Sequence, residues 1–316
     1  MFTGRNVFDI LSQDLHHCRR SVVETEVKKK RGFLDSIPGA IIMYFVLLIA
    51  GSCAGYPVSA FGSSFSDSNP AIYAFCSYAY FIGIWIVTLL LILAVKKDRI
   101  FIKKLKLGSG GTSFKAALAG LISGFAMNGL CILAAGLNGD IHIYFNGGSV
   151  PAFFLILFAV CIQSGAEELV CRFYIYQHLK RGFKSEYAAV IISALMFTLG
   201  HIFNSGVTVL ALVNITLIGL LYALVIYYFD AFWFCALNHT LWNYTQNIIF
   251  GLPNSGIVSS YSIFRLDAST AADSFFYNVN FGVESTCMAT IVILIAIACV
   301  IFFGSAKKSG TVSNPA

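Results

Sequence analysis

The sequence predicts an all-α, polytopic membrane protein, a bundle of about eight transmembrane helices. Hydrophobic residues make up 58% of the 316 residues and charged residues only 11%, whereas a soluble domain carries about 25% charged residues. The chain also holds eight apolar runs, each close to the roughly 20 residues that a helix needs to span a bilayer. These runs lie at about 37–56, 71–95, 116–137, 151–179, 187–204, 207–229, 231–250 and 286–304.

Two of these runs almost touch, and they are treated as separate helices for a reason of length. Residues 187–204 and 207–229 are divided only by Asn204-Ser205-Gly206. A single helix over both runs would be far longer than a span of about 20 residues requires. The sequence therefore predicts a tight turn at Asn204–Gly206.

The positions of the basic residues predict the orientation of the bundle. If the eight runs alternate in direction, 19 of the 21 Lys and Arg residues fall on one side, in residues 1–36, 96–115, 180–184 and the tail. The loops on the opposite side contain one basic residue, Arg265. Basic loops remain on the cytoplasmic side of a membrane. We therefore expect both termini in the cytoplasm, with the plasma membrane as the location.

Three charged side chains lie well inside one predicted helix, in the stretch SGAEELVCRF at residues 164–173. Charged residues at this depth are costly and usually functional. Glu168 and Arg172 are four residues apart, so they share a helix face and can pair. Glu167 points about 100° away, and the residue four positions after it, Cys171, offers no charge. A structural ion pair would explain two of the three charges, but it leaves Glu167 as a candidate general base.

Polar residues of two other helices are predicted at a similar depth. His201 ends the stretch FTLGH in the fifth run, and His239 and Asn243 lie four residues apart in the seventh. With a rise of about 1.5 Å per residue, Glu167, His201 and Asn243 each lie about 20 Å from the basic end of their helices, and His239 about 14 Å. Each residue alone could form a hydrogen bond between helices, but their common depth predicts a functional site. The other histidines, among them His142 and His178, are expected to be structural or solvated.

Two carboxylates, two imidazoles and an amide suit hydrolysis. Glu167 and His201 could hold and deprotonate a water, while His239 and Asn243 could donate hydrogen bonds to a developing oxyanion. A metal is the other route, because Glu167, His201 and His239 would leave the open fourth position of a catalytic zinc. No HExxH motif demands zinc. A thiol mechanism on Cys171 has no histidine positioned on its own helix.

In these motifs the chain resembles the CPBP intramembrane proteases, also called the Abi or CAAX prenyl protease type 2 family. The family pattern is EExxxR, then FxxxH, then HxxxN on successive helices of an eight-helix bundle. The chain reads EELVCR at 167–172, FTLGH at 197–201 and HTLWN at 239–243. The resemblance implies that Glu167 and His201 activate the water, His239 and Asn243 form the oxyanion hole, and Glu168 and Arg172 support them. Phe173 departs from the small residue that many members have there.

The resemblance implies an intramembrane endopeptidase that cleaves a membrane-associated protein or peptide. We expect three regions: a basic N-terminal segment (1–36), the transmembrane bundle (37–304) with its catalytic core at about 151–250, and a cytoplasmic tail (305–316). A non-enzymatic bacteriocin-immunity or partner-binding protein on the same scaffold is the alternative. A proton-coupled transporter would use Glu167 too, but the sequence has no inverted repeat. No motif for binding nucleic acid is present.

Overall fold

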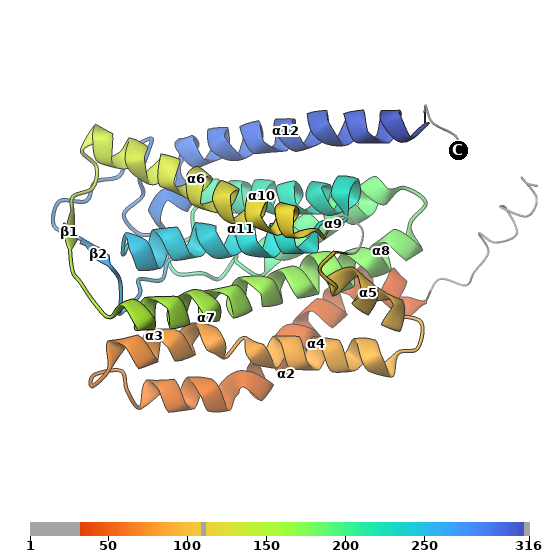
Figure 1. Cartoon of the computed structure of the whole chain (residues 1–316), viewed down its shortest axis with the longest axis horizontal. Helices are drawn as coiled ribbons and strands as arrows, with labels where there is room; N and C mark the ends of the chain where they lie inside the picture. The colour runs from red at the N-terminus through yellow and green to blue at the C-terminus, as the bar shows by residue number, and fades with distance from the viewer. Residues whose placement is uncertain (1–31, 109–111, 313–316) are drawn as a thin grey trace, which may run out of the picture.

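The computed structural model describes residues 32–108 and 112–312, which form one bundle of helices (Figure 1). The predicted basic segment at residues 1–36 lies almost entirely outside the described residues. The helices run along one common direction, and a small two-stranded sheet lies at one end of the bundle. The fold class predicted from composition is therefore confirmed.

The longer helices follow the chain in the order of the apolar runs. They are α2 (Ile37–Ser63), α3 (Pro70–Ala79), α4 (Ile82–Ala94), α6 (Phe114–Asn138), α7 (Val150–Glu168), α8 (Tyr176–Gly182), α9 (Glu186–Leu199), α10 (Val209–Phe229), α11 (Phe232–Tyr244) and α12 (Cys287–Val312). Short helical elements are η1 (Phe33–Asp35), η2 (Arg99–Phe101), α5 (Ile102–Leu105) and η5 (Gly282–Ser285), and π-helical segments are η3 (Leu169–Ile175) and η4 (Thr245–Ile249). Strands β1 (Ile143–Phe145) and β2 (Phe264–Leu266) pair antiparallel.

All eight predicted runs are helical, and six helices are long and apolar enough to cross a membrane. The continuous helices 70–94 and 150–182 each count as one of the six. The other two runs are shorter helices, α9 and α11 with η4, in the part of the chain that the structure describes. Length and composition thus support an integral membrane protein with several spans.

The predicted turn at Asn204–Gly206 is wrong in extent. Helix α9 ends at Leu199, and α10 begins only at Val209, where the side chain of Thr208 accepts a hydrogen bond from Ala211 N. The connection begins with Gly200 and includes Gly206, whose φ of 71° is a left-handed conformation that glycine adopts without strain. His201 therefore lies in a connection between helices rather than inside one.

The centre of the bundle is formed by the helix 150–182 and by α10. Of their most apolar stretches, 61% and 56% of the residues are buried, compared with 28% to 33% in α2, α3–α4, α6 and α12. Helix α11 packs against both α6 and α7. The contact with α6 is close because Gly120 and Gly124 face the backbone of Phe234 and Asn238, where any Cβ would collide with a carbonyl oxygen. Such small-residue stripes are typical of helix pairs in membranes.

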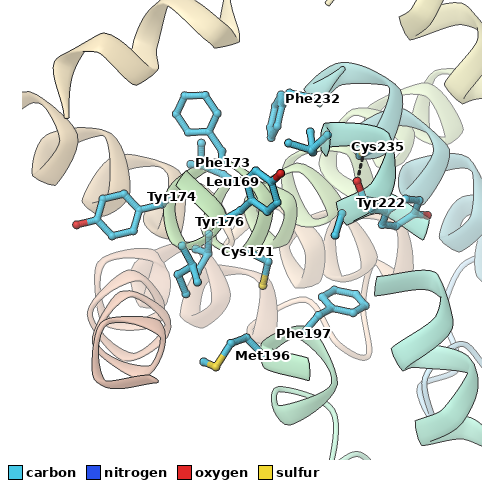
Figure 2. Close-up of a cluster of buried hydrophobic side chains, with 14 of the residues drawn as sticks. Leu169, Cys171, Phe173, Tyr174, Tyr176, Met196, Phe197, Tyr222, Phe232 and Cys235 are labelled. Atoms are coloured by element: carbon cyan, nitrogen blue, oxygen red, sulfur yellow. Dashed lines mark hydrogen bonds between the residues drawn. The ribbon is translucent and has the colours of Figure 1, made fainter. Parts of the chain in front are cut away.

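Aromatic side chains fill the core around this central helix (Figure 2). Phe173, from the π-helical segment, meets Phe232 of α11 edge to face at 5.6 Å between ring centroids. Tyr222 of α10 and Cys235 of α11 are joined by a hydrogen bond from the thiol to the Tyr222 carbonyl. Phe173 therefore packs between helices, and its bulk at this position fills the core.

The described basic residues 96–107, 180–184 and Lys307 gather at the end of the bundle opposite the sheet, where α5 and the end of α8 lie (Figure 1). His178 lies there too and is buried rather than solvated. Its Nδ1 is 2.8 Å from Asp35 Oδ1, and its Nε2 is 3.3 Å from Asp98 Oδ2. Arg181 adds a contact of 2.8 Å to Asp98. This cluster joins η1, the segment before η2, and α8.

Candidate active site

The predicted site residues meet at one cavity of about 500 Å³. Glu167, His201, His239 and Asn243 all line it, although they come from α7, from the connection after α9 and from α11. Among the residues that line this cavity there is no Lys or Arg. The common depth expected from the sequence thus corresponds to a shared cavity.

Glu168 and Arg172 lie behind the cavity and form the ion pair expected from their spacing. Arg172 Nε is 3.2 Å from Glu168 Oε2, and both side chains are fully buried. The guanidinium also donates to the carbonyl of Gly219 at 3.2 Å and lies 4.3 Å from the ring centroid of Phe197. A buried charge needs such partners because its desolvation costs several kcal/mol. The pair therefore joins α7 to α10 and to α9.

Glu167 is not without partners. Gln163, one turn earlier on α7, donates from Nε2 to Glu167 Oε1 at 2.5 Å. The other oxygen, Oε2, lies 3.8 Å from Nε2 of His239. The spacing of Gln163 and Glu167 is the same four residues that predicted the neighbouring ion pair. One oxygen is therefore fixed by α7, while the other faces the histidine across the cavity.

His239 lies between the two carboxylates. Its Nδ1 is 3.0 Å from Glu168 Oε1, whereas its Nε2 is the atom near Glu167. A carboxylate only accepts hydrogen bonds, so Nδ1 carries a proton. When the ring is doubly protonated, Nε2 can donate as well, which the predicted oxyanion role requires. Glu168 thus connects Arg172 with His239 and orients the imidazole.

His201 is oriented by the aromatic residue of its own motif. Its Nδ1 is 2.8 Å from the carbonyl oxygen of Phe197, which can only accept. The proton therefore belongs on Nδ1, and Nε2 remains an acceptor, as a base for water must be. The Phe197 ring also contacts His239 edge to face, at 5.8 Å between centroids. One phenylalanine thus fixes one histidine and packs against the other.

Asn243 is held from two sides. Its Nδ2 donates to Gln163 Oε1 at 3.2 Å and lies 3.5 Å from Ser164 Oγ. Its Oδ1 accepts from Asn254 Nδ2 at 3.3 Å. Asn254 in turn donates to Glu284 at 2.9 Å. The amide therefore has a defined orientation, with its NH₂ group toward α7.

Glu284 reaches the cavity from the loop between α11 and α12. Burial raises the pKa of its carboxyl above the usual value, and hydrogen bonds from Ser255 and Trp242 and the nearby His201 oppose that rise. Sequence reasoning missed this residue because it belongs to a polar loop that no motif marks. It missed Gln163 too, although the spacing to Glu167 was a usable signal.

Helices α7 and α11 each continue into a π-helical segment next to the site. The π-helical segment η3 begins directly after Glu168 and carries Arg172, and η4 begins two residues after Asn243. Single π-helical turns inside α-helices are rare and occur often at functional sites. Each segment here adjoins residues that line or support the cavity.

A comparison with protein families supplies the decisive observation. The family model described as "Rce1-like: Type II CAAX prenyl endopeptidase Rce1-like" matches residues 149–245. Residues 149–245, about a third of the chain, are thus similar to the Rce1-like family. The match contains all six predicted site residues and nearly coincides with the core expected at about 151–250. No curated protein matches the chain at the significance required.

The match to the Rce1-like family supports, in general terms, an intramembrane endopeptidase of the CAAX type, and it suggests a membrane-associated protein as the substrate. Six candidate spans agree with an integral membrane protein. No feature of the family match indicates nucleic acid. The resemblance read from the three motifs is thus confirmed.

The metal route depends on the side chains that could act as ligands. In residues 32–108 and 112–312, no three His, Cys, Asp or Glu side chains are arranged so that they could hold a metal ion. The set predicted for a metal was Glu167, His201 and His239, and a catalytic zinc needs three such ligands. Metal analysis of the purified protein is the direct test of the metal route.

Gly200, beside His201 at the cavity, allows the side chain of Tyr44 to pack closely against the backbone. A Cβ at Gly200 would lie 2.1 Å from the Tyr44 hydroxyl, which α2 places against the site. We expect Gly200→Ala to cost about 1–3 kcal/mol of unfolding free energy, as overpacking does, and to lower activity by displacing His201. Chemical unfolding in detergent measures the first effect.

The matched control for this change is Gly129→Ala in α6, where a Cβ meets nothing within 4 Å. That variant should be no less stable than the unaltered protein, since alanine favours a helix by about 1 kcal/mol over glycine. Combining Gly200→Ala with Tyr44→Phe should restore part of the loss. Equal stability of the two alanine variants would contradict the packing argument.

Proposed function

We propose that the chain is an intramembrane endopeptidase that uses a water activated by Glu167 and His201. The observation that carries the proposal is the convergence of Glu167, His201, His239 and Asn243 on one cavity inside the bundle. Hydrolysis of a peptide bond needs a nucleophile, a base and stabilisation of the oxyanion. The four side chains can supply these functions without a serine or cysteine nucleophile.

In the proposed reaction, water attacks the scissile carbonyl carbon. Glu167 takes a proton from the water, while Nε2 of His201 accepts the water's other hydrogen bond. The negative charge that develops on the carbonyl oxygen accepts hydrogen bonds from Nδ2 of Asn243 and Nε2 of His239, the kind of stabilisation that is usually the largest catalytic contribution. When the C–N bond breaks, the proton on Glu167 passes to the leaving amine.

Glu168 and Arg172 support this chemistry from behind. Glu168 accepts from Nδ1 of His239 and so directs Nε2 toward the cavity. Arg172 balances the charge of Glu168, which would otherwise be buried alone. This arrangement agrees with the roles that the motif resemblance implies.

We infer that the basic end of the bundle faces the cytoplasm. The described lysines and arginines are concentrated at that end (Figure 1), and the positive-inside rule places such residues on the cytoplasmic side. Both ends of the chain and the tail at 305–316 would then be cytoplasmic, in the plasma membrane. The substrate is a membrane-associated protein or peptide.

The test of the proposed function is a cleavage profile of a peptide library by the purified protein and by His201→Ala. We expect a set of cleaved peptides that disappears in the variant, because His201 helps Glu167 to activate the water, and loss of acid–base catalysis lowers such rates by about 10²- to 10⁴-fold. His142→Ala, in the exposed outer loop, is the matched control and should keep the profile. No cleavage by either protein would instead favour the non-enzymatic immunity scaffold.

A further inference from the structure

The carboxylate of Glu284 accepts four hydrogen bonds. Its Oε1 accepts from Asn254 Nδ2 at 2.9 Å and from Trp242 Nε1 at 3.0 Å. Its Oε2 accepts from the backbone N–H of Ser255 at 2.6 Å and from the Ser255 hydroxyl at 3.0 Å. A carboxylate offers about four acceptor positions. Glu284 is therefore engaged in ordering its neighbours, although it lines the cavity.

One of these neighbours connects Glu284 with the proposed oxyanion donor. Glu284 accepts only, so Asn254 must present its NH₂ group. That group also donates to Oδ1 of Asn243, which leaves the NH₂ group of Asn243 for Gln163. Gln163 then presents its own NH₂ group to Glu167. A carboxylate at each end thus sets the same direction for every amide between them.

The two ends are not equivalent once a substrate is present. The NH₂ group of Asn243 has two hydrogens, which point to Gln163 Oε1 at 3.2 Å and to Ser164 Oγ at 3.5 Å, both on α7. To donate to an oxyanion, the group must release one of these two acceptors. With one bond to α7 gone, the bond between Asn254 and Oδ1 of Asn243 carries a larger share of what determines which way the amide faces. A flipped amide would present its oxygen to the oxyanion, which repels it.

We propose that Glu284 is a positioning residue for the reaction and acts through Asn254 to hold the NH₂ group of Asn243 toward the substrate. The inference rests on the proposed function, since it assigns Asn243 the oxyanion role. Glu284 touches no reacting atom in this scheme. It brings the loop between α11 and α12 into the active site as a supporting element.

The backbone of Ser255 gives an independent indication that Glu284 orders this loop. Ser255 has a φ of 49°, a left-handed conformation that costs a residue other than glycine of order 1–3 kcal/mol and persists only when its surroundings impose it. Both donors of Ser255 bind the same oxygen of Glu284. The carboxylate therefore holds the strained residue directly after Asn254.

The experiment is a double-mutant cycle between Glu284→Gln and Asn243→Ala, with kcat and KM measured on a cleaved library peptide. A glutamine keeps the shape but has one oxygen for four donors. We expect Glu284→Gln alone to lower kcat about 10-fold or more, but by no more than the 10²- to 10³-fold that loss of an oxyanion donor costs, and to leave KM within threefold. In the Asn243→Ala background the same change should lower kcat less than about threefold.

Asp273→Asn is the matched control. Asp273 is an exposed carboxylate of the same loop that accepts from Val279 N and Asn278 Nδ2, away from the cavity. It should change neither constant. An equal fall of kcat in both backgrounds, or no fall in the unaltered background, would overturn the proposal.

A second variant serves if Glu284→Gln does not fold. Asn254→Ala removes the connecting amide and leaves Glu284 its bonds to Trp242 and Ser255. It should lower kcat to a similar extent and be equally non-additive with Asn243→Ala. Additive effects of Asn254→Ala would overturn the proposal. If His201→Ala cleaves like the unaltered protein, the proposed function itself fails, and that result differs from every outcome of the cycle.

Discussion

Glu167→Gln is expected to lower kcat about 10²- to 10⁴-fold, the usual contribution of a general base. Glutamine preserves the shape of the side chain and can still accept from Gln163, but it cannot take a proton from water. The fold should persist, because Glu167 is not part of the buried ion pair. Rate measurements on a peptide identified by the cleavage profile, together with thermal unfolding in detergent, check both statements.

The matched control for Glu167→Gln is Glu186→Gln, at the start of α9, where Glu186 pairs with Lys180 at the surface. This variant should keep the full rate, because surface pairs contribute only about 0–1 kcal/mol and Glu186 does not line the cavity. A Glu167→Gln protein that cleaves within threefold of the unaltered rate would remove Glu167 from the catalytic role.

Arg172→Met should have the largest effect on stability, a loss of about 3–5 kcal/mol of unfolding free energy, as when one partner of a buried ion pair is removed. Methionine keeps much of the apolar stem but leaves the Glu168 carboxylate, which is 0% exposed, without its cation. The bond to the carbonyl of Gly219 and the contact with Phe197 are lost too. Denaturant unfolding in detergent measures the difference.

Two further variants separate charge from packing. Arg172→Met combined with Glu168→Gln removes both charges and should regain much of the loss, since a buried pair itself adds little net stability. Arg265→Met, at the one exposed position of strand β2, should change stability by less than about 0.5 kcal/mol. If Arg172→Met costs no more than Arg265→Met, the pair does not stabilise the fold.

Much of the site could be predicted because its residues repeat the period of a helix. The pairing of Glu168 with Arg172 follows from a spacing of four residues, and it is present in the structure even though η3 is π-helical. The same spacing joins Gln163 to Glu167, but Gln163 was counted only as part of an apolar run. A spacing of four residues identifies such neighbours only when uncharged polar residues are considered together with charged ones.

Other contacts have no local signal. Glu284 meets Asn254 and Trp242 across a loop whose path depends on the packing of α10, α11 and α12. The end of α9 at Leu199 was also missed, because hydropathy continues through Gly200 and His201 into the next helix. Hydropathy reports how apolar a stretch is and says little about where its backbone leaves the helix.

The π-helical segment η3 has a consequence for how the long helix 150–182 responds to changes in length. A π-helical turn holds one residue more than an α-helical turn, and one residue rotates all that follows by about 100° around the axis. The phase of Glu167 is therefore set separately from that of His178, which lies beyond the segment. A one-residue deletion that converts the π-helical turn of η3 into an α-helical turn should therefore leave His178 facing Asp35 and Asp98, whereas the same deletion elsewhere between Glu167 and His178 should turn His178 away from them.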